Sequence, residues 1–193
     1  SPYWQEDRDG NWQRNVTASL RQRFAPGWEA GATLFATTGR VRYDDAFSTP
    51  ATAKMTYGTN AVTAFVQGRP AAGWQTELRA GQTRIDYAFD AFTFAPRTQS
   101  RSLAWVNTIA AGPGSVMLGI EQLHQRIDGE GVTTGDFAYV RDARTTDSVF
   151  AGYELELGAH LLRAQVRRDR IQTVGTEPTG ALAWGWRLAP GWL

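Results

Sequence analysis

Residues 147–169 read DSVFAGYELELGAHLLRAQVRRD, and the order of apolar and polar side chains in this segment indicates its secondary structure. Apolar side chains occupy every second position from Val149 to Leu157, and the alternate positions include Ser148, Gly152, Glu154 and Glu156. After Gly158 the alternation resumes through Leu162 and Val166. Successive side chains of a β-strand point to opposite faces of the sheet, so this pattern predicts two strands joined by a tight turn.

The same alternation continues along most of the chain. It predicts nine strands, at residues 14–24, 28–43, 54–69, 74–89, 99–111, 115–127, 146–157, 160–171 and 180–188. Short turns containing glycine alternate with longer polar connectors, which we place at residues 44–53, 90–98, 128–145 and 172–179. Short periplasmic turns and longer extracellular loops are typical of membrane barrels. The sequence therefore predicts an all-β fold, an antiparallel up-and-down transmembrane β-barrel segment in the bacterial outer membrane.

Composition excludes several classes of protein. The chain has 193 residues, a net charge of +1 and no clustered basic footprint, which argues against a nucleic-acid partner. It has no cysteine, which excludes disulfides and thiolate sites. No run of about 20 apolar residues is present to form a transmembrane helix. The first ten residues, SPYWQEDRDG, do not resemble a signal peptide, as in a mature or excised chain.

The two faces of the predicted sheet differ in chemistry. We expect the apolar set to face outer-membrane lipid: Leu20, Val116, Leu118, Val149, Leu155, Leu162 and Val166. We expect the charged set to face inward: Arg21, Arg23, Glu77, Arg79, Glu154, Arg163 and Arg167. Aromatic residues near the turns suit a membrane interface: Phe24, Trp28, Trp74, Trp184, Trp186 and Trp192. The alternative is a soluble β-sandwich with these rings in its core.

Catalytic chemistry has little support in the sequence. The two histidines, His124 and His160, fall near opposite ends of predicted strands and lack a neighbouring serine or acid in a catalytic pattern. We therefore expect no enzyme. The inward arginines and glutamates either line a solute path or form ordinary ion pairs in the lumen, and we prefer the second.

Acidic residues gather at two places on the long-connector side. Asp7 and Asp9 precede the first strand, and Asp44 and Asp45 follow the second. Calcium takes six to eight oxygen ligands, so carboxylates from adjacent loops suit it. The alternative is a pair of solvated loop tips.

Several motifs resemble the barrel of the cobalamin (vitamin B12) TonB-dependent outer-membrane receptor family. The motifs, spread over nearly the whole chain, are Asp7-Arg8-Asp9-Gly10, Pro26-Gly27-Trp28-Glu29-Ala30-Gly31, Arg42-Tyr43-Asp44-Asp45-Ala46-Phe47, Gly114-Ser115-Val116-Met117-Leu118-Gly119-Ile120-Glu121 and Ala183-Trp184-Gly185-Trp186-Arg187. The resemblance implies calcium-assisted uptake of cobalamin or a similar nutrient chelate, energised by TonB.

The resemblance also implies metal ligands. The family's calcium-binding acids map onto Asp7, Asp9 and Asp44, and its tyrosine ligand maps onto Tyr43. The chain departs from the family at residues 50–53, which read Pro-Ala-Thr-Ala where the family has a further loop aspartate. Asp45 is the residue available to compensate.

The family's receptors have a barrel of about 22 strands and, in addition, a plug that contacts TonB. We therefore expect residues 1–193 to be part of a single receptor barrel domain, with the plug and the remaining strands absent. Such a fragment alone should bind nutrient far more weakly than the intact receptor. Two other functions stay open: a self-contained barrel of about eight strands with a structural or adhesion role, and an outer-membrane enzyme.

Overall fold

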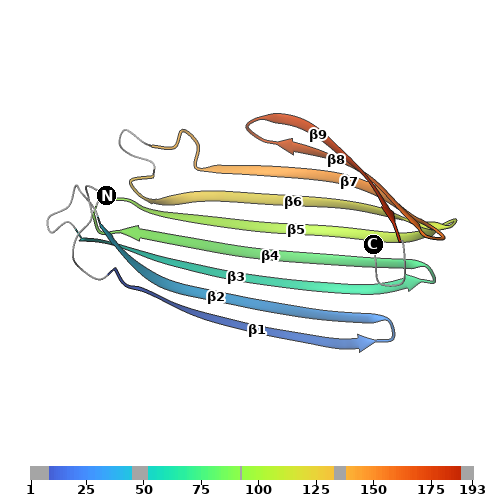
Figure 1. Cartoon of the computed structure of the whole chain (residues 1–193), viewed down its shortest axis with the longest axis horizontal. Coiled ribbons are helices and arrows are strands. Elements are labelled where there is room, and N and C mark those ends of the chain that lie inside the picture. The colour runs from blue at the N-terminus through green and yellow to red at the C-terminus, as the bar shows by residue number, and fades with distance from the viewer. Residues whose placement is uncertain (1–8, 45–51, 92, 133–137, 188–193) are drawn as a thin grey trace.

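The computed structural model describes residues 9–44, 52–91, 93–132 and 138–187 (Figure 1). These residues form an all-β fold of nine strands in one sheet, in which each strand pairs antiparallel with the next along the chain. The strands are β1 (Asn11–Ala25), β2 (Trp28–Asp44), β3 (Thr52–Ala71), β4 (Trp74–Phe89), β5 (Ala95–Ala111), β6 (Gly114–Glu130), β7 (Ala143–Leu157), β8 (His160–Ile171) and β9 (Gly175–Trp186). The prediction of an antiparallel up-and-down all-β fold is confirmed.

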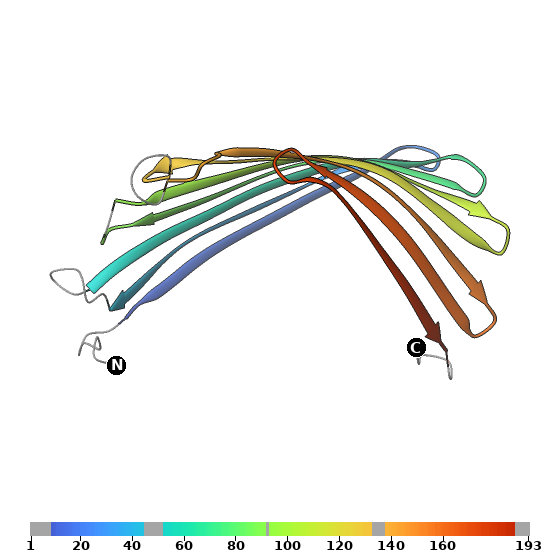
Figure 2. The ribbon, with the colours of Figure 1, turned by 90° about the horizontal axis from the view of Figure 1, so that it is seen from above.

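The sheet is strongly arched, with one concave and one convex side (Figure 2). Within the described residues β1 and β9 each pair with one strand only, and not with each other. Two hydrophobic side chains of the described part, Ala53 and Val132, are buried. The soluble sandwich alternative requires two packed sheets around a core, and the described residues form a single sheet.

No helix in the described ranges has the length and apolarity to cross a membrane.

The two ends of the sheet have different connectors. At one end, two-residue turns at 26–27, 72–73, 112–113 and 158–159 join the strands. Each contains a glycine with positive φ, between 60° and 74°, a backbone conformation that L side chains rarely adopt. The connectors at the other end are mostly longer, with 45–51 between β2 and β3 and 131–142 between β6 and β7. The predicted asymmetry of the connectors is confirmed, with one exception at β9.

The last strand begins earlier than its predicted start at residue 180. The connector before it covers only residues 172–174, so the long connector predicted at 172–179 is wrong. The segment taken as a connector contains Pro178, which lies inside β9 although proline usually interrupts a strand. Pro178 pairs with Arg168 of β8, and β9 itself has only this one described neighbour. Proline cannot donate a backbone hydrogen bond, and such an edge strand accommodates it.

The strand register sorts the side chains onto the two faces as predicted. Directly paired residues of antiparallel strands lie on the same face, and the pairs Leu20↔Ala32, Leu118↔Ala151 and Leu155↔Leu162 all belong to the convex face. Many of these apolar side chains are open to the surroundings: Leu20 is 72% exposed, Val166 63% and Leu182 80%. The predicted inward charges all fall on the opposite, concave face.

The apolar residues of the convex face form a slanted band, which we call the apolar band. Its border toward the long connectors runs through the residues Val16, Ala36, Val62, Ala80, Leu103, Ile120, Val149, Val166 and Gly180, one on each strand from β1 to β9. The border residue of β9 is Gly180, and following the directly paired residues from it through Val166 across the sheet leads to Trp28 on β2. The border residue of β2 is Ala36, which is eight residues further along that strand. The border therefore shifts by about one residue per strand.

This shift gives the slant of the strands relative to the apolar band. A step of ~3.3 Å along a strand for every ~4.8 Å between strands corresponds to a tilt of about 35°. Membrane barrels have strand tilts of about 35–45°. The band covers about eight residues per strand, which at this tilt is roughly 20 Å high, close to the apolar height of such barrels.

Polar side chains inside the apolar band are paired with each other. The indole N–H of Trp74 donates to Asn107 Oδ1 at 2.9 Å, and that of Trp105 donates to Thr76 Oγ1 at 2.9 Å. All four residues lie on the convex face. An unsatisfied polar group costs several kcal/mol in hydrocarbon, so these pairs make the band compatible with an apolar environment.

Candidate functional site

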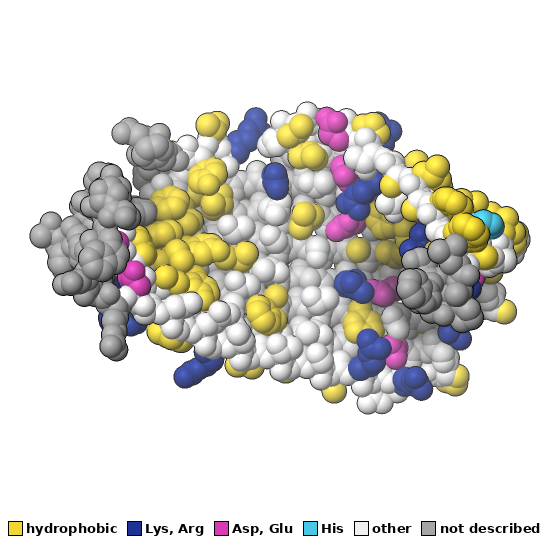
Figure 3. Space-filling model, in the orientation of Figure 1, with side chains coloured by type: hydrophobic (Ala, Val, Ile, Leu, Met, Phe, Trp, Pro, Cys, Tyr) yellow, Lys and Arg dark blue, Asp and Glu magenta, His cyan; other side chains and the backbone are white. Residues whose placement is uncertain are grey.

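The concave face carries the charged side chains that are candidates for a functional site. Figure 3 views this face and shows charges across its middle and its tight-turn half, whereas hydrophobic side chains gather toward the long-connector end. The strands place every second residue on this face, which is why charges separated by two residues, such as Arg21 and Arg23, share it.

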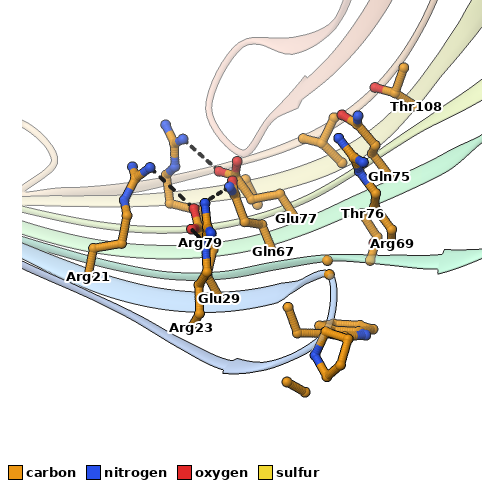
Figure 4. Close-up of a pocket in the computed structure, with 17 residues that line it drawn as sticks. Arg21, Arg23, Glu29, Gln67, Arg69, Gln75, Thr76, Glu77, Arg79 and Thr108 are labelled. Carbon is orange, nitrogen blue, oxygen red and sulfur yellow. Dashed lines mark hydrogen bonds and ion pairs between the residues drawn. The ribbon is translucent and has the colours of Figure 1, made fainter.

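Glu29 is the centre of one cluster, near the turns of the first strands. Arg21 Nη1 lies 3.2 Å from Glu29 Oε1, Arg23 Nε lies 3.9 Å from Oε2, and the Gln67 amide donates to Oε1 at 2.6 Å. The Glu29 side chain is only 13% exposed, so burial makes these partners necessary. β1, β2 and β3 each supply one or more of the four side chains (Figure 4).

A cavity of about 870 Å³ opens beside this cluster. Glu77 and Arg79 from β4 line it and form an ion pair at 2.6 Å. In total four arginines and two glutamates line the cavity: Arg21, Arg23, Arg69, Arg79, Glu29 and Glu77. The lining is therefore net positive, which favours an anionic group of a ligand over a cationic one.

Arg167 is the centre of a second cluster, between β6 and β8. Its Nη2 donates to Glu121 Oε2 at 2.9 Å and to Ser148 Oγ at 2.7 Å, and its Nε donates to Asp169 Oδ1 at 2.8 Å. Ser148 is a buried polar residue. These contacts support the view that the inward charges form structural ion pairs, at least at Arg167.

Each cluster contains an arginine above an aromatic ring. The Arg21 guanidinium lies 5.2 Å from the centre of the Phe65 ring, and that of Arg167 lies 5.5 Å from the Phe150 ring. Both rings lie over a glycine of the adjacent strand, where a Cβ would be 2.6 Å and 2.2 Å from the nearest ring atom. This arrangement was not predicted from the sequence, because an aromatic residue opposite a glycine can be recognised only once the strand register is known.

The predicted calcium ligands are only partly within the described residues. Asp7 and Asp45 lie outside them. Asp9 and Tyr43 come to the same end of the β1–β2 pair, because the Arg42 N–H donates to the Gly10 carbonyl at 3.0 Å, and Asp44 is the last residue of β2. Among the described residues no group of three or more acidic or histidine side chains is arranged to hold a metal. Calcium therefore remains a prediction.

The strand next to this end supplies no carboxylate. Tyr43 pairs with Ala53, where the family resemblance led us to look for an aspartate. Asp90 contacts β3 near this end: its carboxylate accepts a hydrogen bond from the Lys54 backbone N–H at 2.5 Å and forms an ion pair with Lys54 Nζ at 3.2 Å. Partial burial raises the pKa of Asp90, but these contacts outweigh it and hold the pKa below its ordinary value.

The two histidines have separate, structural partners. His124 Nδ1 lies 3.0 Å from Thr145 Oγ1, and His160 stacks on Trp184 and Trp186 and accepts a hydrogen bond from the Trp184 indole. In the part of the chain that is described, neither histidine is hydrogen-bonded to a carboxylate or a serine.

No known family model matches this chain, and none of the curated proteins is similar to it.

Proposed function

We propose that this chain forms part of the wall of an outer-membrane β-barrel. The observation that carries the proposal is the exposed convex face: apolar side chains cover it across all nine strands, and no other described element packs against it. A soluble monomer rarely exposes a contiguous apolar patch of more than a few hundred Å². Lipid is the environment in which such a face is stable.

The slant and the interior chemistry support the same proposal. A tilt of about 35° is what a closed barrel requires of its strands. The concave face, with its arginine–glutamate clusters, has the polarity of a barrel lumen. Aromatic residues Trp28, Trp74 and Trp186 lie at the turn-side border of the apolar band, where an indole ring can be half in lipid and half in water.

Within that wall, we propose a role in recognition and uptake of cobalamin or a similar nutrient chelate, energised by TonB. The motifs around Asp9, Trp28 and Tyr43 that resemble the cobalamin receptor family support it. So does the position of Asp9 and Tyr43 at one end of a strand pair. The net positive cavity beside Glu29 offers a place for an anionic part of a large ligand.

The predicted calcium ligands provide the test of this role. In the intact receptor that contains this chain, Asp9→Ala should weaken calcium binding and reduce the calcium-dependent part of cobalamin affinity. Calorimetric titration of cobalamin with calcium and with a chelator measures both. Asp142→Ala removes an acid at the same end of the sheet and serves as the control.

Two outcomes would contradict the proposal. Equal cobalamin affinity with calcium and with chelator would leave Asp9 an ordinary loop residue. Submicromolar cobalamin affinity of the isolated 193-residue chain would mean that the binding site is complete without other parts of a receptor.

A further inference from the structure

The convex face changes character just beyond the long-connector border of the apolar band. At the first two convex positions past the border, the nine strands carry six arginines and one acid, Asp147. We call the arginines the basic belt; they are Arg14, Arg40, Arg84, Arg101, Arg168 and Arg170. The belt follows the slant of the border across the sheet, from β1 to β8.

Most of the basic belt is not neutralised by the protein. Arg84 is bound to Asp86, with Nε and Oδ2 2.8 Å apart. The other five belt arginines form no ion pair with any described residue. Asp147, the one acid, instead accepts a hydrogen bond from Gln122 at 2.8 Å. Arg101, Arg168 and Arg170 are also exposed. Unpaired, exposed arginines in a row are available to an external anion.

The opposite border of the apolar band has a different composition. On the convex face there, the described residues include no lysine or arginine, and aromatic rings such as Trp74 and Trp186 occupy the border. Arg69, near the end of β3, lines the concave cavity instead. On the convex face of the described residues, positive charge therefore follows only the long-connector border of the apolar band.

The depth of the basic belt matches that of lipid headgroups. Successive side chains on the convex face of a strand are two residues apart. At a tilt of about 35° this spacing corresponds to roughly 5 Å along the barrel axis, so the belt lies about 5–11 Å beyond the border. The headgroup region on each side of a bilayer is about 5–8 Å thick. Arginine binds phosphate through two parallel hydrogen bonds, which suits a phosphorylated headgroup at this depth.

We propose that the basic belt binds the phosphate groups of lipopolysaccharide in the outer leaflet of the outer membrane. This inference rests on the proposed barrel wall and adds its lipid partner and orientation: the long connectors face outward. The lipid A phosphates replace the ion-pair partners that the belt arginines lack within the sheet.

The test compares two double variants that remove the same charge. Arg168→Gln with Arg170→Gln removes belt cations, and Arg144→Gln with Arg163→Gln removes concave-face arginines from the adjoining strands β7 and β8. The full chain, folded in neutral detergent, is titrated with lipid A, with dephosphorylated lipid A and with inorganic phosphate. Heat-modifiable electrophoretic mobility checks that each variant is folded.

A basic residue near an anionic membrane surface contributes about a fivefold gain in affinity, so the belt variant should bind lipid A about 25-fold more weakly. The control pair should stay within about twofold of the unmodified chain. Arg101→Gln alone should lose about fivefold, which keeps the test valid if the double variant does not fold.

Equal losses in the two double variants would overturn the proposal. So would equal affinity of the unmodified chain for lipid A and its dephosphorylated form, or binding of inorganic phosphate as tightly as lipid A. Failure of the unmodified chain to enter lipid vesicles at all would instead contradict the barrel wall, so the two failures are distinguishable.

Discussion

Four glycines of the sheet lie directly opposite a large aromatic residue on the neighbouring strand. The pairs are Gly31↔Phe65, Gly39↔Tyr57, Gly68↔Trp28 and Gly119↔Phe150. In each, a Cβ on the glycine would lie between 2.2 and 2.6 Å from the nearest ring atom. The ring therefore rests on the backbone of the adjacent strand, and the space that glycine leaves is used for packing.

This packing predicts the effect of adding a methyl group at Gly119. Gly119→Ala should push the Phe150 ring away and disturb Arg167 above it, at a cost of about 1–3 kcal/mol in the free energy of unfolding. Gly152→Ala is the matched control, because its Cβ would make ordinary contacts of 3.4 Å or more on the same face. Urea unfolding from lipid vesicles measures both, and equal stability of the two variants would contradict the prediction.

Asp90 gives a prediction that depends on pH. Burial raises the pKa of Asp90, but its contacts with Lys54 outweigh this effect and lower it. A lowered folded pKa means that the carboxylate stabilises the fold above its unfolded pKa of about 3.9, and that this contribution is lost as the pH falls through the folded pKa. The NMR shift of the Lys54 amide should therefore titrate with a midpoint below about 3.9.

Asp90→Asn is the control for this titration, because it keeps the shape of the side chain and removes the charge. The low-pH transition of the Lys54 amide should disappear in that variant. A midpoint at or above the ordinary value would mean that the Lys54 contacts do not stabilise the carboxylate in solution.

Neighbouring residues on β6 face opposite environments. Leu118 lies in the middle of the apolar band and is 45% exposed, whereas Met117 points to the concave face. Leu118→Arg should cost about 2–4 kcal/mol in membrane stability, and Met117→Arg much less, because only the first places a charge in lipid. Equal costs, measured by unfolding from vesicles, would mean that the convex face does not contact hydrocarbon.

The strands were predictable because alternation is a local property. Each strand carries its own period of two, so the centres of all nine were located from the sequence. The start of β9 was missed because Pro178 signals a loop by itself, and only the position of the strand at a sheet edge makes it tolerable. Such an effect depends on neighbours and is absent from the local pattern.

The candidate site was less predictable than the strands. Charges such as Arg21 and Glu77 were assigned to the correct face by their parity in the strand. The ion-pair partners of these charges were not predicted. An ion pair such as Arg167–Glu121 joins residues 46 positions apart, and such a contact can be identified only when the pairing of the strands is known. The slant of the apolar band likewise requires the pairing of all nine strands.

The two outer strands of the sheet, β1 and β9, have one edge each without a described partner. Unpaired N–H and C=O groups cost several kcal/mol each in hydrocarbon, so these edges must be covered in a membrane. In vesicles, the isolated chain should bring β1 and β9 together, within one copy or between two. The chain has no native cysteine, so single cysteines introduced along β1 and β9 should report this by forming disulfides.

A disulfide within one chain would mean that the sheet closes on itself, and a disulfide between chains that two copies pair. Cysteines on both edges that stay reduced in the membrane-inserted chain would contradict the prediction. Cysteines on the central strand β5, placed at equal depth, provide the background rate.

The slant of the strands also sets how much circumference each of them contributes. At a tilt of about 35° a strand occupies roughly 6 Å of perimeter, so every added strand widens a closed barrel by about 2 Å. Eight such strands enclose a backbone cylinder about 15 Å across, which side chains fill, whereas about 22 enclose one near 41 Å. The number of strands in the closed barrel would therefore set the width of the lumen that the concave face lines.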